Sequence, residues 1–251
     1  MKLILLLGLL IPSLSSAYRF TNDFNNGYYW GDYPIPLVVV AKTSEEASNL
    51  LAILSRAVEE WEDAIGQDIW DVSGDTVIGN SFQGNEVRFS DDFANETGFD
   101  PVNTLAVAIR YHSGTFYSQT KILLNGALIN IRRNNNNLYR VILHELGHTI
   151  GLDHSEVQYA MMAPYISATN SLQSDDVAGG NAVVDENNYR RSVGFVSPLV
   201  GNTQSSESNA LSSCGTVSFV DSGGGGGPGN GISLLLGLFL IPLLRRKKRI
   251  A

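Results

Sequence analysis

The chain has 251 residues, with 25 acidic and 17 basic side chains and a formal net charge of −8 at pH 7. Six of the basic residues lie in residues 1–17 and 231–251, which hold no acidic residue, so 11 basic and 25 acidic side chains remain, an acidic excess of 14. Such a surface disfavours nucleic acid and anionic membrane as partners. The one cysteine, Cys214, cannot form an internal disulfide, and we expect a monomer stabilised by its core and by bound metal.

Residues 1–17 have the order of a secretory signal peptide. Lys2 precedes an apolar run at residues 3–11, and a stretch of small residues ends at Ala17. The apolar run is shorter than a membrane span, which takes roughly 20 residues. We therefore expect cleavage between Ala17 and Tyr18 and export of the remaining chain.

Residues 231–251 form a second terminal signal, joined to the rest by a Ser/Gly-rich linker at 201–230. Five glycines at 223–227 lead into an apolar stretch at 232–244, which is followed by five basic residues. This order is similar to the GlyGly-CTERM sorting tails of Gram-negative bacteria. The resemblance implies transient association with the inner membrane and removal by a sorting protease. The protein would then be secreted or lie at the surface of a Gram-negative bacterium, and a permanent single-span anchor is the alternative.

Residues 18–200 have the pattern of one α/β domain. Apolar residues recur at three- and four-residue steps after Thr43, which has capping-box spacing with Glu46 and so predicts a helix. β-Branched apolar runs and period-two alternation predict strands, and an asparagine run can cap a second helix. The expected elements are a strand at 36–40, a helix at 43–65, strands at 86–90, 104–111 and 121–125, and a helix that begins near Leu138.

The chemistry lies in residues 144–154, which read HELGHTIGLDH. On a helix, His144 and His148 are one turn apart and point from the same face towards one ion. Glu145 lies beside them, where it can hold a water without being a ligand. Gly151 can take the left-handed conformation that ends the helix and turns the chain, which brings His154 to a third position. Three neutral imidazoles with one open position suit a catalytic Zn²⁺ ion.

These residues resemble the metzincin metallopeptidases, and within them the matrixin type. Residues 151–155 read GLDHS, and Met162 lies eight residues after His154 and two before Pro164, which is similar to the matrixin Met-turn. The resemblance implies that Met162 forms an apolar floor under the zinc, and that Asp175 and Asp176 begin the last helix. It also implies the metzincin fold: a twisted, mixed and mostly parallel sheet, an active-site helix, and a small C-terminal subdomain after the third ligand.

The chain departs from the matrixin pattern in several places. Only His112 is available for the upstream structural zinc site, so we do not expect that site, and we expect no inhibitory propeptide with its cysteine. Ala163 replaces the bulky aromatic residue common after the methionine, which changes the pocket for the substrate side chain. Calcium could bind the acidic loops around residues 91, 92 and 100, although a solvated loop is the preferred explanation of these residues.

The sequence therefore predicts a zinc-dependent endopeptidase that cleaves protein or peptide substrates, with Glu145 as general base. An edge strand at 104–111 could bind extended substrate by strand addition. Three alternatives stay open. A distant glutamate could replace His154 as the third ligand, as in gluzincins. The domain could be a non-catalytic zinc-containing binding module at the cell surface, which would have no use for Glu145. Cys214 could be a latency ligand for the zinc or a free thiol of the linker.

Overall fold

The computed structural model describes residues 17–74, 76–200, 210–214 and 218–219. The predicted tail at 231–251 lies outside these residues, as does the predicted signal peptide apart from Ala17. Two short strands are described within the predicted linker at 201–230, most of which lies outside as well. All described elements belong to one unit, residues 1–220. No helix in the described ranges is long and apolar enough to cross a membrane.

The elements follow the predicted order with additional short pieces. The strands are β1 (Tyr29–Trp30), β2 (Ile35–Pro36), β3 (Val38–Ala41), β4 (Trp70–Asp71), β5 (Thr76–Ile78), β6 (Glu86–Ser90), β7 (Ala106–Ser113), β8 (Phe116–Asn125), β9 (Tyr165–Ile166), β10 (Ala210–Cys214) and β11 (Ser218–Phe219). The helices are α1 (Asn22–Asn25), α2 (Ser44–Ile65), α3 (Phe93–Thr97), α4 (Ile129–Arg132), α5 (Asn135–Ile150) and α6 (Ser174–Ser192).

The main sheet has the strand order β10-β7-β8-β6-β3-β5, and β1 pairs with the start of β8. The pairs β3–β5, β3–β6, β6–β8 and β1–β8 are parallel, whereas β7–β8 and β10–β7 are antiparallel. The predicted mixed, mostly parallel sheet is therefore confirmed. The free edge predicted at 104–111 differs, because β10 of the same chain pairs along β7.

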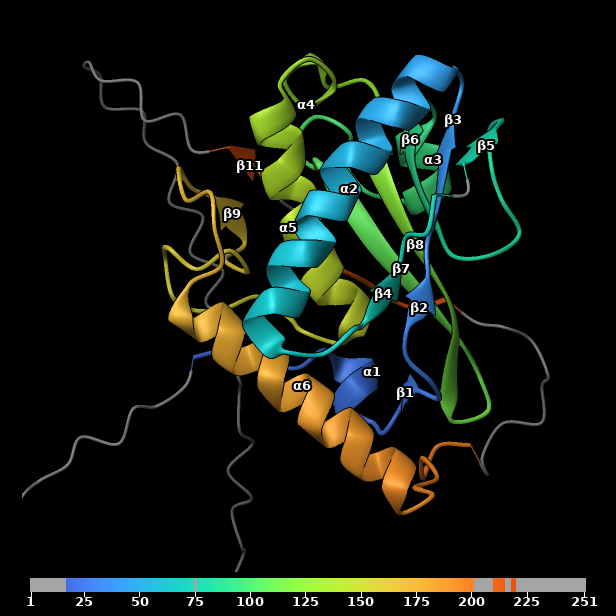
Figure 1. Cartoon of the computed structure of the whole chain (residues 1–251), viewed down its shortest axis with the longest axis vertical. Coiled ribbons are helices and arrows are strands. Elements are labelled where there is room, and N and C mark those ends of the chain that lie inside the picture. Colours follow the sequence, from blue (N-terminus) through green and yellow to red (C-terminus); the bar gives the residue numbers. More distant parts are fainter. Residues whose placement is uncertain (1–16, 75, 201–209, 215–217, 220–251) are drawn as a thin grey trace, which may run out of the picture. The chain divides into compact units, whose positions relative to one another are not determined.

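The period-two pattern of β7 divides its side chains between two faces. Val107 and Ile109 pack with Phe93 of α3 in a small cluster on one face. Ala106 and Ala108 belong to the main core on the other face. Figure 1 shows the long helices α2 and α5 crossing the sheet together, with α6 lying across their ends. The small alanine side chains of β7 leave room for α5 to pack on the sheet.

All three tryptophans of the chain donate their indole N–H to α5. Trp61 on α2 donates to the carbonyl oxygen of Leu143 at 2.8 Å. Trp30 donates to the carbonyl oxygen of Thr149 and Trp70 to its hydroxyl, both at 2.9 Å. All of these groups are buried, where a donor left without a partner costs about 1–3 kcal/mol. The position of α5 is therefore fixed from three separate segments.

A buried ion pair connects β7, α1 and the end of α5. The Arg110 guanidinium donates to both carboxylate oxygens of Asp23, at 2.8 and 3.0 Å, and also to the carbonyl oxygen of His148. Burial alone would raise the pKa of Asp23, but the adjacent guanidinium outweighs it and lowers that pKa below its usual value. The positive charge also suits the C-terminal end of a helix, where unpaired carbonyls concentrate negative charge.

We predict that Asp23→Ala destabilises the fold by about 3–5 kcal/mol, because it leaves the Arg110 guanidinium buried without its counter-ion. The matched control is Asp32→Ala, which removes an exposed pair with Arg191 and should cost less than about 1 kcal/mol. Urea unfolding of both variants measures the difference. An equal loss in the free energy of unfolding for both variants would mean that the buried pair stabilises the fold no more than the exposed pair does.

Candidate metal centre and active site

Both ends of α5 are fixed by local sequence. The Asn134 side chain caps the start by accepting hydrogen bonds from the backbone N–H groups of Asn136 and Asn137, at 3.0 and 3.1 Å. At the other end Gly151 has φ 114°, and a Cβ there would lie 2.7 Å from the Phe24 ring. The predicted left-handed glycine is confirmed, and it turns the chain back towards the face of the helix that carries the histidines.

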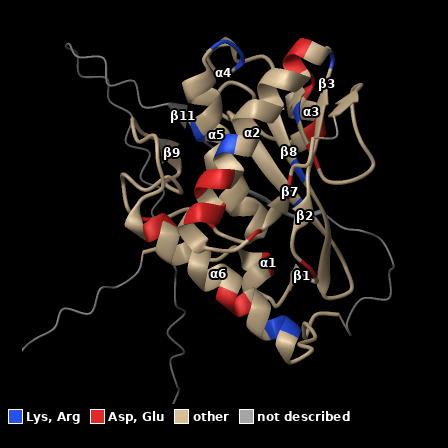
Figure 2. Ribbon diagram, viewed as in Figure 1, with Lys and Arg blue, Asp and Glu red and all other residues tan. Residues whose placement is uncertain are grey.

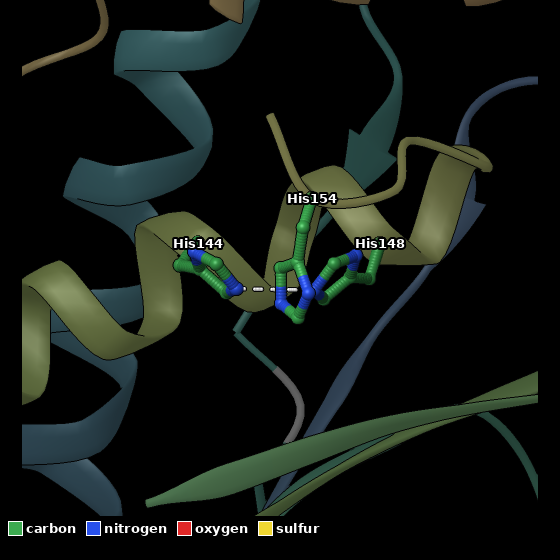
Figure 3. Close-up of side chains that lie close together, drawn as sticks. All are labelled: His144, His148 and His154. Carbon is green, nitrogen blue, oxygen red and sulfur yellow. Dashed lines mark hydrogen bonds between the residues drawn. The ribbon is translucent and has the colours of Figure 1, made fainter. Parts of the chain in front are cut away.

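The structure brings together the three histidines that the sequence predicts. Figure 3 shows His144 and His148 on α5, with His154 reaching over them from the returning loop. One nitrogen from each ring can be chosen so that all three lie within 4.8 Å of one another. The Nε2 atoms of His144 and His148 are 3.0 Å apart. They form the one group of three or more possible metal ligands found in the described part of the chain.

The partners of the other ring nitrogens show what this group requires. His144 Nδ1 lies 2.7 Å from the carbonyl oxygen of Met161, and His148 Nδ1 lies 2.7 Å from that of Leu152. A carbonyl can only accept, so both Nδ1 atoms carry the proton and both Nε2 atoms present a lone pair. His154 Nε2 is buried with no hydrogen-bond partner. Two nitrogens on one tetrahedral Zn²⁺ ion would be about 3.3 Å apart, so these residues fit zinc.

The surroundings keep the rings in the form that binds metal. Burial and, to a smaller extent, the nearby His154 lower the pKa of His144 to about 3, against the opposing hydrogen bond to the backbone of Met161. Burial likewise lowers the pKa of His148 and the pKa of His154. The charge of Asp153 opposes this shift at His154. All three imidazoles are therefore neutral at neutral pH, and their lone pairs are available without release of a proton.

The predicted Met-turn lies against α5. A Cβ on Gly147 would overlap the Met162 sulfur, so the glycine lets that side chain pack on the helix between His144 and His148. Asp176 accepts hydrogen bonds from the backbone N–H groups of Met161 and Met162, at 2.7 and 2.8 Å. Because the carbonyl of Met161 holds His144, the Asp176 carboxylate positions a metal ligand through the turn. Pro164 comes two residues after Met162 and directly precedes β9.

Glu145 lies on α5 beside the histidines, and both of its carboxylate oxygens are buried without a hydrogen-bond partner. Burial raises the pKa of its carboxyl well above the usual value, and the backbone of Ala108 and the charge of Arg110 oppose that shift. A carboxylate that is reluctant to remain charged in its environment accepts a proton readily.

Other residues singled out in the sequence lie apart from this site. His112 is at the end of β7, where its ring contacts Tyr28 at 4.3 Å and its Nδ1 lies 3.1 Å from the carbonyl oxygen of Gly114. Asp91 pairs with Lys42 and Arg132. Asp92 accepts from Asn95, and Asp100 accepts from Asn103 and from the backbone of residue 102. Calcium in these loops stays a sequence-based prediction, as does a role for the Cys214 thiol.

Sequence reasoning missed the residues that support the site from behind. Asp23 and Arg110 are 87 positions apart, and no local pattern connects them. The sequence predicts Asp176 only as part of a helix start. Its spacing from Gln173 is that of a capping box, which the structure contains. That signal would have placed Asp176 at the helix N-terminus but not against the Met-turn.

We predict that Asp176→Ala weakens zinc binding about 10- to 100-fold, because the Met-turn loses the carboxylate that holds it against His144. Competition with a chromophoric chelator measures the affinity. The control is Asp185→Ala, which removes an exposed carboxylate from the same helix and should leave the affinity unchanged. An unaltered affinity in Asp176→Ala would remove that residue from the support of the site.

A pH dependence follows from the lowered histidine pKa values. Below about pH 6.5 the histidines of the unfolded chain bind protons, whereas those of the folded, metal-free chain do not. The free energy of unfolding therefore decreases as the pH is lowered, by up to about 1.4 kcal/mol per pH unit for each histidine. The raised pKa of Glu145 works in the opposite direction, so the measurement is best made on the metal-free Glu145→Gln variant. Urea unfolding should show lower stability at pH 5.5 than at pH 7.5. Adding His148→Gln should reduce the slope, and a stability independent of pH would contradict the assignment.

The comparisons with known proteins agree with this geometry. The family described as Matrixin matches residues 38–183, which is more than half of the chain. A 58-residue stretch, 22% of this chain, is 40% identical to a protein named hatching enzyme from Paracentrotus lividus, of which it covers 10%. A 50-residue stretch, 19% of this chain, is 50% identical to an interstitial collagenase from Aquarana catesbeiana, of which it covers 13%. The chain thus spans a small part of these relatives, while its own fold and histidine site lie within the family match: it belongs to the matrixin family.

Proposed function

We propose that the chain is a zinc-dependent endopeptidase that hydrolyses peptide bonds in protein substrates. The observation that carries the proposal is the convergence of three imidazole lone pairs beside the unpartnered carboxylate of Glu145. Family membership supports the same chemistry.

The residues divide the work of hydrolysis between binding and proton transfer. His144, His148 and His154 would hold the zinc, which when bound polarises a peptide carbonyl and lowers the pKa of water to roughly 7. Glu145 takes a proton from the attacking water and delivers it to the nitrogen of the leaving amine. Its burial, which raises the pKa of the carboxyl, makes the carboxylate a stronger base than an exposed glutamate.

The ligand set supports a catalytic rather than a structural metal. Structural zinc usually has four protein ligands, whereas catalytic zinc has three and leaves one position for water or substrate. Three side chains gather here in the part of the chain that is described, and Glu145 lies beside them. A binding module would need neither the open position nor the base. His154 also fills the place that a distant glutamate would take in the gluzincin alternative.

The charge of the domain supports a protein substrate over nucleic acid. Acidic residues are prominent along the C-terminal half of α2 and on α6 (Figure 2). They would repel phosphate backbones near the surface. An extended peptide, by contrast, binds through its main chain to a strand edge and needs no matching charge.

Export is a further part of the proposal. The expected signal peptide at 1–17 and the GlyGly-CTERM-like tail at 231–251 imply that the chain leaves a Gram-negative cell, with passing inner-membrane association and a sorting protease as partner. We expect the exported chain to be a monomer. The support is the order of charged, apolar and small residues at both ends. N-terminal sequencing of protein from the medium and the cell surface tests it, and a chain that retains Met1 would contradict it.

We predict that zinc-loaded protein cleaves casein, that a chelator stops the reaction, and that added zinc restores it. Glu145→Gln should bind zinc and unfold like the parent but lose at least about 10³-fold in rate, since a positioned general base contributes roughly 10²–10⁴-fold. The control is Glu156→Gln, an exposed carboxylate nearby, which should retain full activity. Undiminished cleavage by Glu145→Gln would remove that residue from the mechanism, and a folded, zinc-loaded parent without activity would favour the binding module.

A further inference from the structure

The loop that follows α5, residues 151–154, carries more of the metal site than His154 alone. The carbonyl oxygen of Leu152 lies 2.7 Å from His148 Nδ1 and so fixes the tautomer of that ligand. His154 is the third ligand (Figure 3), and its backbone N–H donates to the Asp153 carboxylate at 2.7 Å. A displacement of this loop would therefore move one zinc ligand and also the hydrogen-bond partner of another.

This loop is paired with an early segment of the chain, residues 18–21, which we call the strap. Phe20 of the strap lies opposite Leu152 in an antiparallel bridge. Two backbone hydrogen bonds, both 2.8 Å long, flank the bridge, one from the N–H of Thr21 to the carbonyl oxygen of Gly151 and one from the N–H of Asp153 to the carbonyl oxygen of Arg19. In this antiparallel arrangement the two opposed side chains lie close together. The strap therefore holds the loop through its main chain on both sides of Leu152.

The strap is itself anchored to two helices. The ring of Phe20 packs on the ring of Phe24 in α1, with 5.1 Å between the centroids, and Phe24 belongs to the main core. Tyr18 and Leu152 lie together against α6, since a Cβ on Gly179 would lie 2.9 Å from each of their side chains. The strap thus connects the loop that carries His154 to α1 and to α6.

Such a connection favours metal binding because it restricts the loop before the ion binds. His144 and His148 are fixed within a helix, whereas His154 lies beyond the helix end and depends on its loop for its position. Ordering a mobile loop on binding costs free energy and lowers the affinity for the ligand. A loop that is already held in place by the strap avoids most of that cost.

We propose that the strap is a positioning element of the zinc site, which holds the 151–154 loop and thereby raises the affinity for Zn²⁺. The inference rests on the proposed zinc-dependent function. The contributing groups are the backbone N–H and carbonyl groups of the strap and the ring of Phe20. The ion pair between Arg19 and Glu156 contributes little, because the two side chains are 60% and 62% exposed.

The substitution Thr21→Pro in the full chain tests the strap. Thr21 has φ −61° and ψ 154°, values that proline can adopt. The substitution removes two hydrogen bonds to the carbonyl oxygen of Gly151, from the backbone N–H at 2.8 Å and from the hydroxyl at 3.2 Å. Competition with a chromophoric chelator should show a dissociation constant for Zn²⁺ at least about tenfold higher than that of the parent. The matched control, Thr21→Val, keeps the N–H and should change the constant less than about threefold.

A second control separates positioning from a general loss of stability. Leu123 is buried in the small cluster on the face of the sheet away from α5, so Leu123→Ala should unfold at lower urea concentration and bind Zn²⁺ like the parent. The visible absorption of Co²⁺ bound in place of Zn²⁺ depends on the geometry of its ligands, and it should change in Thr21→Pro but not in Leu123→Ala. Parent-like affinity in Thr21→Pro, or an equal loss of affinity in Leu123→Ala, would overturn the inference.

Phe20→Ala gives an independent result if Thr21→Pro does not fold, because the Phe20 side chain is only partly buried. Loss of the ring that anchors the strap on Phe24 should also raise the dissociation constant for Zn²⁺, and an unchanged value would overturn the inference.

Casein hydrolysis by the same preparations separates this inference from the proposed function. A parent that binds Zn²⁺ and cleaves no casein would contradict the peptidase, while weaker Zn²⁺ binding by Thr21→Pro would still support the strap. A parent that binds no Zn²⁺ would overturn both.

Discussion

The structure depends on two imidazole lone pairs that face each other at 3.0 Å. Two backbone carbonyls fix the tautomers of His144 and His148, so neither ring can donate to the other. The two Nε2 lone pairs therefore repel each other. Burial and the neighbouring rings oppose protonation of either ring, so a proton does not relieve this repulsion. A cation between the rings removes it, and the third imidazole, from His154, gives that cation its geometry.

The rest of the fold keeps these groups in place from several directions. The three indole N–H groups fix α5 against the sheet and the loops around it. The Asp23–Arg110 pair connects β7 to the end of α5. Asp176 accepts a hydrogen bond from Met162 and so holds the Met-turn against the middle of α5. These contacts come from segments far apart in the sequence. They would keep the ligands in position while a peptide enters and leaves, which is the preorganisation that catalysis on a metal requires.

Local patterns in the sequence were sufficient to predict the ligands and the main elements. His144 and His148 follow from helical spacing, Gly151 from the need for a positive φ, and the Thr43 cap from side-chain chemistry. The asparagine run was predicted to cap the second helix, which begins at Asn135 rather than near Leu138, with Asn134 as its cap. The supporting contacts could not be predicted in this way, because Asp23 meets Arg110 only once the sheet has formed. The same is true of β10 and β11. The polar composition of residues 201–230 indicates a linker. The pairing of β10 with β7 and of β11 with β9 depends on the tertiary structure, which composition does not reveal.

X-ray absorption spectroscopy at the zinc edge of the zinc-loaded chain shows directly whether the three histidines leave an open position on the metal. We expect one ion per chain with three nitrogen ligands at about 2.0–2.1 Å and one oxygen ligand at the open position. A sulfur ligand at about 2.3 Å would instead place the thiol of Cys214 on the metal. Either that result or four protein nitrogens would contradict an open catalytic position and the mechanism built on it.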